Sequence, residues 1–158
     1  MIRRATHGDA EVIADVFLSA RADALPEVPL VHSESETRDY LLRLVTNPAN
    51  EVWVAERGGG VVGFLSLRED WVDHLYLRPG WYRQDIGTAL LNVAKIGRPG
   101  GLRLYCFQCN RRARAFYEAQ GFFVVRVADG SDNEEHEPDI EYAWSADASA
   151  ASSRPGSA

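Results

Sequence analysis

The chain has few of the residues that cross-link a protein or hold a metal. Of its 158 residues only two are cysteines, Cys106 and Cys109, and they lie three positions apart. A structural zinc site usually needs four ligands, and the sequence has no second cysteine pair and no histidine pair at ligand spacing. We therefore interpret the two as reduced thiols at the end of a buried strand, because free cysteine behaves as a small hydrophobe.

Long apolar runs and an excess of positive charge are also lacking. No stretch approaches the roughly 20 apolar residues of a membrane span, and the arginines at positions 3 and 4 are not followed by a signal-like segment. We therefore expect a cytoplasmic protein with no membrane partner. The formal net charge of -6 argues against nucleic acid as a partner, since a general binder needs a basic surface to neutralise phosphates.

The apolar pattern alternates between the periods of strands and helices. Alternating or valine-rich runs predict about seven strands, at residues 2–5, 51–56, 61–67, 71–77, 102–107, 122–127 and 140–144. Helical spacing predicts about four helices, which begin near Asp9, Ser33, Ile86 and Asn110. Ser33 and Glu36 form a capping-box pattern, while Asp9 and Asn110 are residue types that cap helices.

The order of these elements predicts an α/β fold of the α+β type. Its central sheet is mixed and mostly antiparallel, because a meander is followed by a strand–helix–strand unit that needs a parallel crossover. We assign residues 1–146 to a single domain, a length typical of one. Residues 147–158 are Ala, Ser, Asp, Gly, Pro and one Arg. Such a composition buries too little apolar surface to become ordered, so we expect a disordered tail.

An anion-binding site is predicted where the strand ending at Leu77 passes through a loop into the helix that opens at Ile86. The first backbone N–H groups of a helix lack partners within it, and the helix dipole is positive there. Phosphate groups bind readily at such a position. Gly87 would let a phosphate approach the backbone closely.

Two segments carry the most specific pattern in the chain. One is Tyr82-Arg83-Gln84-Asp85-Ile86-Gly87, and the other runs from Asn110 through Ala113, Phe116 and Tyr117 to Gly121 and Phe122. They resemble two motifs of the GCN5-related N-acetyltransferase (GNAT) family. These are the Gln/Arg-x-x-Gly-x-Gly/Ala loop, which cradles the pyrophosphate of acetyl-CoA, and the later Asn-x-x-Ala-x-x-Phe-Tyr-x-x-x-Gly-Phe. The resemblance implies a GNAT-like acyl-CoA N-acyltransferase fold with acetyl-CoA as cosubstrate.

The resemblance also implies which residues contact the cofactor. In the family, backbone N–H groups at the end of the strand before the loop bind the acetyl carbonyl. The loop and the start of the later helix hold the rest of the cofactor. The matching positions here are Leu75, Tyr76, Leu77, Tyr82, Arg83, Gln84, Asp85, Ile86, Gly87, Thr88, Ala89, Asn110 and Ala113.

The phosphate loop departs from the family pattern at three positions. Tyr82 stands where Gln or Arg is expected, Arg83 at a position that is often glycine, and Asp85 at the first motif glycine. A carboxylate in the cradle would repel pyrophosphate. Three readings stay open: Asp85 caps the helix and fills the anion site with its own side chain, Arg83 offsets the charge, or the loop turns Asp85 outward.

Tyr117 is the predicted catalytic acid. By resemblance, a tyrosine at this position lies near the thioester sulfur and protonates the leaving thiolate. A phenol with a pKa of ~10 is a reasonable acid for a thiolate whose conjugate thiol has a pKa of ~8.5. The alternative is that Tyr117 only packs beside Phe116 on one face of the helix.

The general base is predicted among residues near the start of the strand at 71–77. Some relatives use a glutamate at the position that is Trp71 here. Glu69 and Asp73 lie two residues either side, and strand alternation puts them on one face. Either could accept the amine proton, directly or through water; the alternative for each is a solvated charge. We interpret His74 as structural, on the opposite face.

The predicted function is therefore transfer of an acetyl group from acetyl-CoA to a primary amine, by direct attack in a ternary complex and without a metal. The acceptor is a small molecule or a peptide. We interpret the acidic run at 132–139 as a solvated hairpin loop. Two alternatives stay open, a calcium or zinc site and a rim of the acceptor pocket that is expected to be shared with the loop at 25–35. Two other readings stay open: a degenerate ligand-binding module with weakened CoA binding, and a longer acyl-CoA donor. A homodimer through the last strands also stays open.

Overall fold

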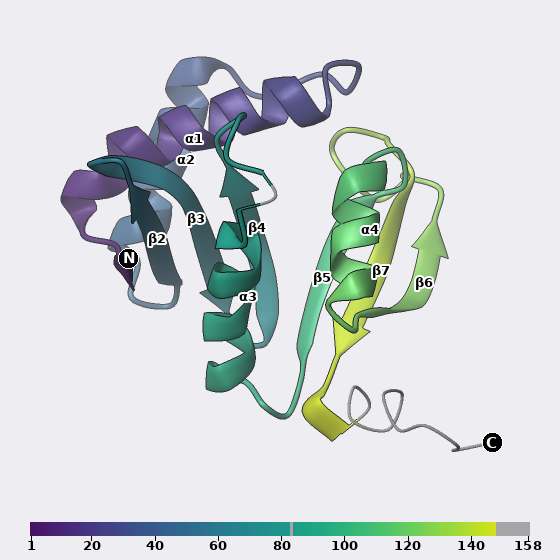
Figure 1. Cartoon of the computed structure of the whole chain (residues 1–158). Helices are drawn as coiled ribbons and strands as arrows, with labels where there is room; N and C mark the ends of the chain where they lie inside the picture. Colours follow the sequence, from purple (N-terminus) through teal and green to yellow (C-terminus); the bar gives the residue numbers. More distant parts are fainter. Residues whose placement is uncertain (83, 148–158) are drawn as a thin grey trace.

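The computed structural model describes residues 1–82 and 84–147, and its strands form one mixed sheet (Figure 1). In spatial order the strands are β1 (Ile2–Arg4), β2 (Glu51–Arg57), β3 (Gly60–Arg68), β4 (Trp71–Leu77), β5 (Leu102–Phe107), β7 (Asp139–Trp144) and β6 (Phe123–Ala128). The helices are α1 (Ala10–Ala24), α2 (Glu34–Thr46), α3 (Ile86–Gly97) and α4 (Arg111–Ala119). The predicted fold class is confirmed.

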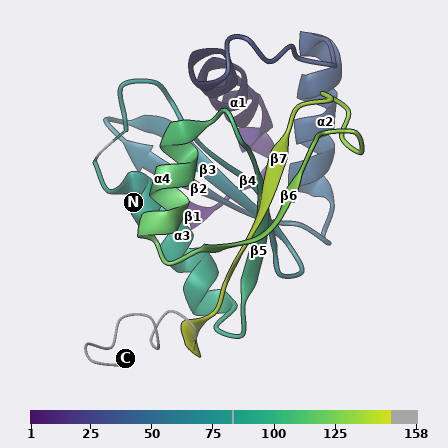
Figure 2. The ribbon, with the colours of Figure 1, turned by 90° about the vertical axis from the view of Figure 1, so that its right-hand side faces the viewer.

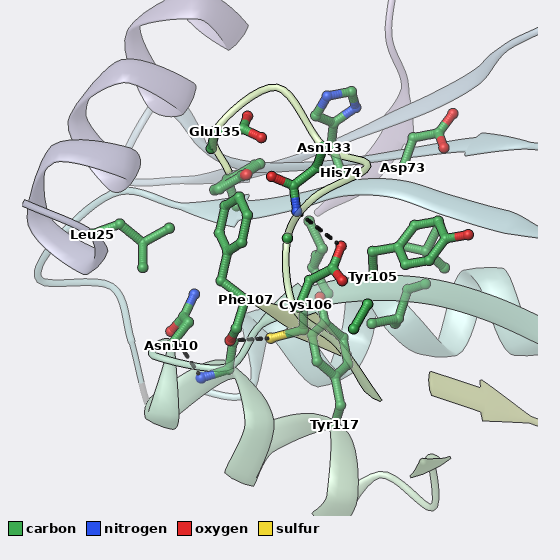
Figure 3. Close-up of a pocket in the computed structure, with 18 of the residues that line it drawn as sticks. Leu25, Asp73, His74, Tyr105, Cys106, Phe107, Asn110, Tyr117, Asn133 and Glu135 are labelled. Carbon is green, nitrogen blue, oxygen red and sulfur yellow. Dashed lines mark hydrogen bonds between the residues drawn. The ribbon is translucent and has the colours of Figure 1, made fainter. Parts of the chain in front are cut away.

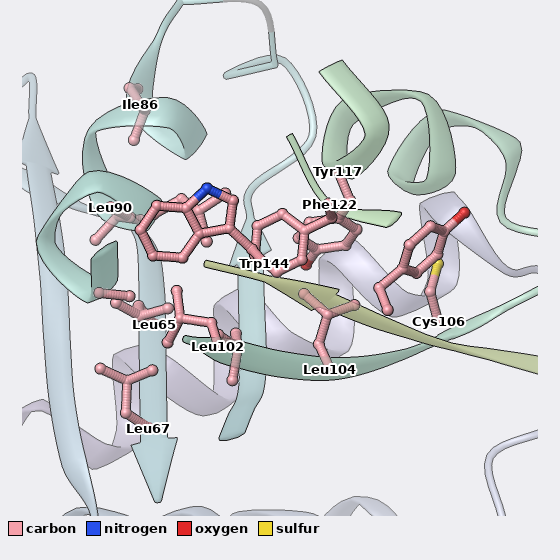
Figure 4. Close-up of a cluster of buried hydrophobic side chains, with 14 of the residues drawn as sticks. Leu65, Leu67, Ile86, Leu90, Leu102, Leu104, Cys106, Tyr117, Phe122 and Trp144 are labelled. Atoms are coloured by element: carbon pink, nitrogen blue, oxygen red, sulfur yellow. The ribbon is translucent and has the colours of Figure 1, made fainter. Parts of the chain in front are cut away.

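The sheet separates two hydrophobic clusters. On one face, α1 and α2 pack over the first four strands through side chains such as Ile13, Leu41 and Phe64. On the other face, α3 and α4 cover a larger cluster in which aliphatic side chains of β3, β5 and α3 meet aromatic ones from α4 and β7 (Figure 4). Helices α1 and α2 lie over the β1–β4 part of the sheet, and the loop between them reaches the loop between β6 and β7 (Figures 1 and 2).

Strands β4 and β5 are the parallel neighbours in this sheet, and they separate almost at once. Among the described residues their ladder consists of the single pair Trp71 and Arg103. All other neighbouring strands pair antiparallel over three or more residues. Beyond Arg103 the two strands diverge toward their C-terminal ends, and the sheet opens into a wedge (Figure 1).

Local capping explains where two of the helices begin. Ser33 Oγ accepts a hydrogen bond from the Glu36 N–H at 3.1 Å, and the Glu36 carboxylate accepts one from the Ser33 N–H, which confirms the capping box. Asn110 Oδ1 accepts from the Ala113 N–H at 3.3 Å, which confirms that cap.

Asp9 occupies the predicted N-cap position of α1, but its side chain does not supply the capping hydrogen bond. A short 3-10 turn, His7–Asp9, precedes the helix. The Asp9 carboxylate turns back to accept from the Thr6 N–H at 2.7 Å and from Arg3 Nη1 at 2.8 Å, and it makes no capping bond into α1. It therefore fastens β1 to the start of the helical layer.

Two predictions concern the ends of the sheet and of the chain. The edge strand β6 exposes apolar side chains, including Phe123, Val125 and Val127, and the homodimer through the last strands stays a prediction.

The expected tail lies outside the described residues from position 148 onward. Within the described ranges, no helix is long and apolar enough to cross a membrane.

Replacing Asp9 with Asn should lower the free energy of unfolding by about 2 kcal/mol at pH 7. The hydrogen bond from Arg3 lowers the pKa of Asp9 from 3.8 to about 2, so the ionised carboxylate stabilises the fold above pH ~4 and loses this effect as the pH falls through about 2. Urea unfolding at pH 7, 4 and 2.5 should show the difference between the two proteins shrinking with acid. A constant difference would contradict it, and the exposed Glu11→Gln is the control.

Candidate active site

A cavity of about 410 Å³ lies in the wedge between β4 and β5. Its walls come from both strands, the start of α4, the end of α1 and the loop between β6 and β7 (Figure 3). The structure gathers residues from separate predicted segments around this space: Asp73, Leu75, Tyr76, Asn110, Ala113 and Tyr117.

Backbone amides of β4 face this cavity. The Arg78 N–H donates to Val62 O at 2.8 Å, toward β3. Because successive N–H groups alternate sides along a strand, those of Leu75 and Leu77 point the other way, toward the diverging β5. The N–H of Tyr76, the third predicted carbonyl-binding residue, points toward β3 and is not available. The end of β4 therefore presents the N–H of Leu75 to the cavity, which Leu75 lines, and that of Leu77 on the same side of the strand one step beyond the lining.

Tyr117 reaches from α4 into the cavity (Figure 3). Its ring is 8% exposed and contacts Phe116 and Phe122 edge-on, at centroid distances of 5.3 and 5.6 Å. Burial raises the pKa of its hydroxyl, with a further contribution from Cys106. Tyr117 is thus a packed core residue that also holds a neutral O–H at the cavity.

The two cysteines differ in their surroundings. Both are free; Cys106 is buried and Cys109 is exposed, so the expected burial is confirmed for the first and wrong for the second. Cys109 lies past the end of β5, where the chain turns toward α4. Burial raises the pKa of Cys106 to about 12. A thiol that stays protonated at neutral pH is a poor nucleophile.

At the start of α3, Asp85 has a left-handed backbone, with φ of +61°. Glycine adopts this conformation at little cost, whereas other residues are strained in it, which explains why the family motif has glycine here. The Asp85 side chain is exposed and makes no capping hydrogen bond. The reading in which Asp85 fills the anion site as a cap is therefore wrong, and its carbonyl accepts the first helical bond from Ala89.

The other residues at the start of α3 join this helix to α4. A Cβ on Gly87 would lie 3.4 Å from the Phe116 ring, so this glycine makes room for an aromatic neighbour. Thr88 Oγ1 accepts a hydrogen bond from Gln120 Nε2 at 3.1 Å. These contacts fix the helix start next to the helix that carries Tyr117.

The predicted cofactor loop is tied to two helices. The Tyr82 hydroxyl donates to Asp23 of α1 at 3.2 Å, and the Arg112 guanidinium of α4 lies 4.0 Å from the Tyr82 ring centroid. Arg112 also pairs with Asp23 at 3.4 Å. Gln84 is exposed, and Arg83 lies outside the described residues.

A β-bulge determines which residue of β4 enters the cavity. The register with β3 jumps from the pair Ser66–His74 to the pair Leu67–Val72, so Asp73 has no partner. A bulge breaks the alternation of faces, and both Asp73 and His74 line the cavity. The placement of His74 on the opposite face is therefore wrong.

The two candidate bases lie in different places. Burial raises the pKa of Asp73, and Arg68, whose Nε is 3.2 Å from Asp73 Oδ2, opposes that rise. Glu69 lies in the turn between β3 and β4, has φ of +57° and is exposed. It does not line the cavity, whereas Asp73 does, on the side away from Tyr117 (Figure 3).

His74 connects this cavity to a second one. Its Nδ1 lies 2.7 Å from Ser66 Oγ and its Nε2 lies 3.4 Å from the Tyr40 hydroxyl. Burial lowers the pKa of His74 to about 4, so the ring is neutral at pH 7. Tyr40 borders the second cavity.

The second cavity, of about 580 Å³, lies beneath the two loops that were expected to rim the acceptor pocket. His32 from the first loop and Glu134 from the acidic loop meet at 3.0 Å and join the rims. Glu135 lines both cavities. Within the described ranges, no group of three or more His, Cys, Asp or Glu residues is arranged to hold a metal ion.

Comparison with known proteins supplies the family. The sequence model for the family described as "Acetyltransferase (GNAT) domain" matches residues 48–124. The peptidyl-lysine N-acetyltransferase YiaC of Escherichia coli strain K12 is 30% identical over 138 residues, which cover 81% of this chain and 86% of that protein. The chain belongs to the GNAT acetyltransferase family. It is an acyltransferase.

Solved GNAT structures share the fold. The solution structure of apo-form YjaB from Escherichia coli superimposes with a TM-score of 0.74 at 23% identity, covering 91% of this chain and 96% of that one. The crystal structure of the PaiA N-acetyltransferase from Thermoplasma acidophilum in complex with coenzyme A gives a TM-score of 0.67 at 20% identity, covering 89% and 96%. The cavity between β4 and β5 thus lies in a fold that these solved structures share.

Several residues at the two cavities were not predicted as site residues. Cys106 and Phe107 line the first cavity, and Arg21 lines the second. A signal for Arg21 was present, because it lies four positions after Phe17 and one after Ala20, on the apolar stripe of α1. A charged residue on such a stripe is a candidate for a buried role.

Alkylation should distinguish the two cysteines. With iodoacetamide at pH 8, Cys106 should react at least ~100-fold more slowly than Cys109, because its raised pKa and burial leave almost no accessible thiolate. Mass spectrometry of timed samples measures both rates. Cys109→Ser should abolish the fast phase, and equal rates in the folded protein would contradict the buried setting of Cys106.

Proposed function

We propose that this GNAT protein transfers an acetyl group from acetyl-CoA to a primary amine by direct attack of the amine on the thioester. The observation that carries the proposal is one cavity whose lining includes Leu75 of β4, with its free-facing N–H, together with Tyr117 and Asp73. These are an oxyanion site, an acid and a base, the groups that acyl transfer to an amine requires.

The residues at the start of α3 fit the pyrophosphate of acetyl-CoA. The exposed Asp85 leaves the first amides of the helix, those of Ile86, Gly87 and Thr88, without its side chain as a cap. Those amides and the positive end of the helix dipole would hold the phosphates, with the Arg112 guanidinium close by on the loop residue Tyr82. When bound, acetyl-CoA supplies the acetyl group as an activated thioester.

The amine must be neutral before it attacks. Asp73 would accept its proton, directly or through water, and the burial that raises the pKa of this carboxyl makes it a better base than an exposed aspartate. The N–H groups of Leu75 and Leu77 would then donate to the oxygen that becomes negative in the tetrahedral intermediate.

Tyr117 would donate its hydroxyl proton to the departing thiolate. Its raised pKa makes it a weaker acid than a free phenol, yet the thiolate is affected in the same way. Cys106, a thiol that lines the same cavity, has a pKa of about 12. Exclusion of water would disfavour the charged thiolate of CoA as well, so proton transfer from Tyr117 to it would be favoured over a thiolate left ionised.

Direct transfer is favoured over a covalent acetyl-enzyme. Cys106 is the thiol nearest to these groups, and its raised pKa keeps it protonated. Proximity of two bound substrates then supplies much of the rate. Among the described residues, the lining of the cavity carries the carboxylates of Asp132, Glu135 and Asp139 against the one cation Arg126, an excess of negative charge that favours a cationic amine, as does the net charge of -6.

A second candidate function rests on Asp85. A negative charge and a strained backbone at the motif glycine are what a ligand-binding module that no longer holds CoA tightly would have. The two functions differ in CoA affinity.

Tyr117→Phe should lower kcat by about 10²- to 10³-fold and leave the KM for acetyl-CoA nearly unchanged, because only the proton donor is lost. Steady-state assays of CoA release with a panel of amines measure both constants. The control is Tyr142→Phe, which removes a hydroxyl that donates to Glu118 instead of facing the cavity. An unchanged kcat would leave Tyr117 with a packing role alone.

Asp85→Gly should bind acetyl-CoA about tenfold more tightly, because it removes the negative charge. Its free energy of unfolding should be about 1 kcal/mol higher, because glycine is not strained by the left-handed backbone. Calorimetry and urea unfolding measure the two effects. Asp85→Asn separates them, because it removes the charge and keeps a side chain. Micromolar binding by the native chain supports the enzyme; binding by Asp85→Gly alone supports the module; no binding by either contradicts the proposed cofactor site.

A further inference from the structure

Arg21 is a buried arginine whose charge is not matched within the described structure. It lies on the inner face of α1 and is 6% exposed. Its Nε and Nη2 atoms are buried and have no hydrogen-bond partner among the described residues. Its guanidinium lies 5.6 Å from the ring centroid of Phe107, which lines the cavity next to β4.

Such an arrangement is costly for the folded protein. A guanidinium cannot lose its proton at any ordinary pH, so burial cannot neutralise it as it would a lysine. An aromatic ring offsets part of the lost hydration. Two buried donors without acceptors leave a penalty that an anionic partner would remove.

Arg21 faces the acceptor side of the molecule. It lines the second cavity together with Phe17, Tyr40 and Glu135. Asp23 follows two positions later, about 200° around the helix, and binds Tyr82 of the cofactor loop. Arg21 therefore points away from the phosphate site, which makes a CoA phosphate an unsuitable partner.

The other charged residues of the second cavity leave the buried donors of Arg21 free to bind a ligand. Its walls carry the carboxylates of Glu36, Asp39, Glu134 and Glu135, the cation Arg43 and the imidazole of His32, which lies next to Glu134. None of these carboxylates hydrogen-bonds to Arg21 Nε or Nη2. A ligand that complements the charges of this cavity therefore has a positive group next to the carboxylates and a negative group next to Arg21.

We propose that Arg21 binds a carboxylate of the acceptor, so that the enzyme acetylates an amine that also bears a carboxylate, as an amino acid does. This inference rests on the proposed acetyl transfer. The planar guanidinium can donate two parallel hydrogen bonds to the carboxylate. Glu135, at the end of the first cavity opposite Tyr117 (Figure 3), lines both spaces and links the carboxylate site to the reaction site.

Matched acceptors test the proposal. L-lysine and 1,5-diaminopentane have the same amine chain, and only lysine has a carboxylate. The native enzyme should show a kcat/KM about 100-fold higher for lysine, and Arg21→Met should reduce this ratio to about 1. Lysine methyl ester should behave as the diamine. Equal rates for lysine and the diamine in the native enzyme, or an unchanged preference in Arg21→Met, would overturn it.

A second set of acceptors distinguishes the source of the carboxylate. A short peptide that ends in lysine is compared with its C-terminal amide. Preference for the free acid, lost in Arg21→Met, assigns the site to a peptide terminus. Preference confined to free lysine assigns it to a small amino acid.

Thermal unfolding tests the site without turnover. Arg21→Met should raise the melting temperature of the unliganded protein by a few degrees, because it removes an unpaired buried charge. Glutarate should stabilise the native protein but not the variant, and the exposed Arg57→Met is the control. A melting temperature that falls, with no glutarate effect, would make Arg21 structural and overturn the inference. If no amine is acetylated while glutarate still stabilises through Arg21, the acetyl transfer fails and the carboxylate site stands.

Discussion

The parallel contact between β4 and β5 is made at one pair of residues, and the site depends on how firmly that pair is held. Arg103 donates its N–H to Asp70 O at 2.9 Å, and its guanidinium lies 4.7 Å from the Trp71 ring centroid. Trp71 in turn stacks on Tyr105 at 4.9 Å. These contacts close the wedge at one end, so the strands can separate at the other without splitting the sheet. The amides of Leu75 and Leu77, two half-buried residues, have no ladder partner among the described residues of β5 as a result, and an amide left without a partner when water is excluded is costly. A cosubstrate that accepts their hydrogen bonds would remove that cost.

Much of the fold follows from local patterns. Helical spacing and two caps, at Ser33 and Asn110, place α2 and α4 correctly, and the strand–helix–strand unit predicts the parallel crossover. Tyr117 could be predicted because it belongs to a motif within one helix. The bulge at Asp73 could not, because it is a mismatch with β3 that no single strand reveals. Arg21 could not be assigned either, since the absence of a partner is a property of the assembled walls.

The start of α3 shows a conflict between a local preference and a function. A left-handed backbone at Asp85 strains an aspartate, and its exposed carboxylate adds a negative charge at the helix start that is predicted to hold the phosphates. Yet the helix start is rigid, because Gly87 receives Phe116 and Thr88 binds Gln120. Rigidity of this kind keeps the amides in place at no entropic cost when an anion binds. The strain is therefore local, and a substitution at Asp85 can relieve it without moving the framework.

Burial has opposite consequences for the groups around the two cavities, and the proposed chemistry uses both. It raises the pKa of Tyr117 and Cys106, which keeps both neutral and makes any thiolate formed between them a strong base. It cannot neutralise Arg21, so there the unpaired charge persists and favours a carboxylate. A small amine with a carboxylate would then be held at its anionic end while its amine lies among the carboxylates that include Glu135 and Asp73. In the proposed reaction, the second cavity would orient the acceptor and the first would favour proton transfer to the leaving group, because both effects follow from the exclusion of water.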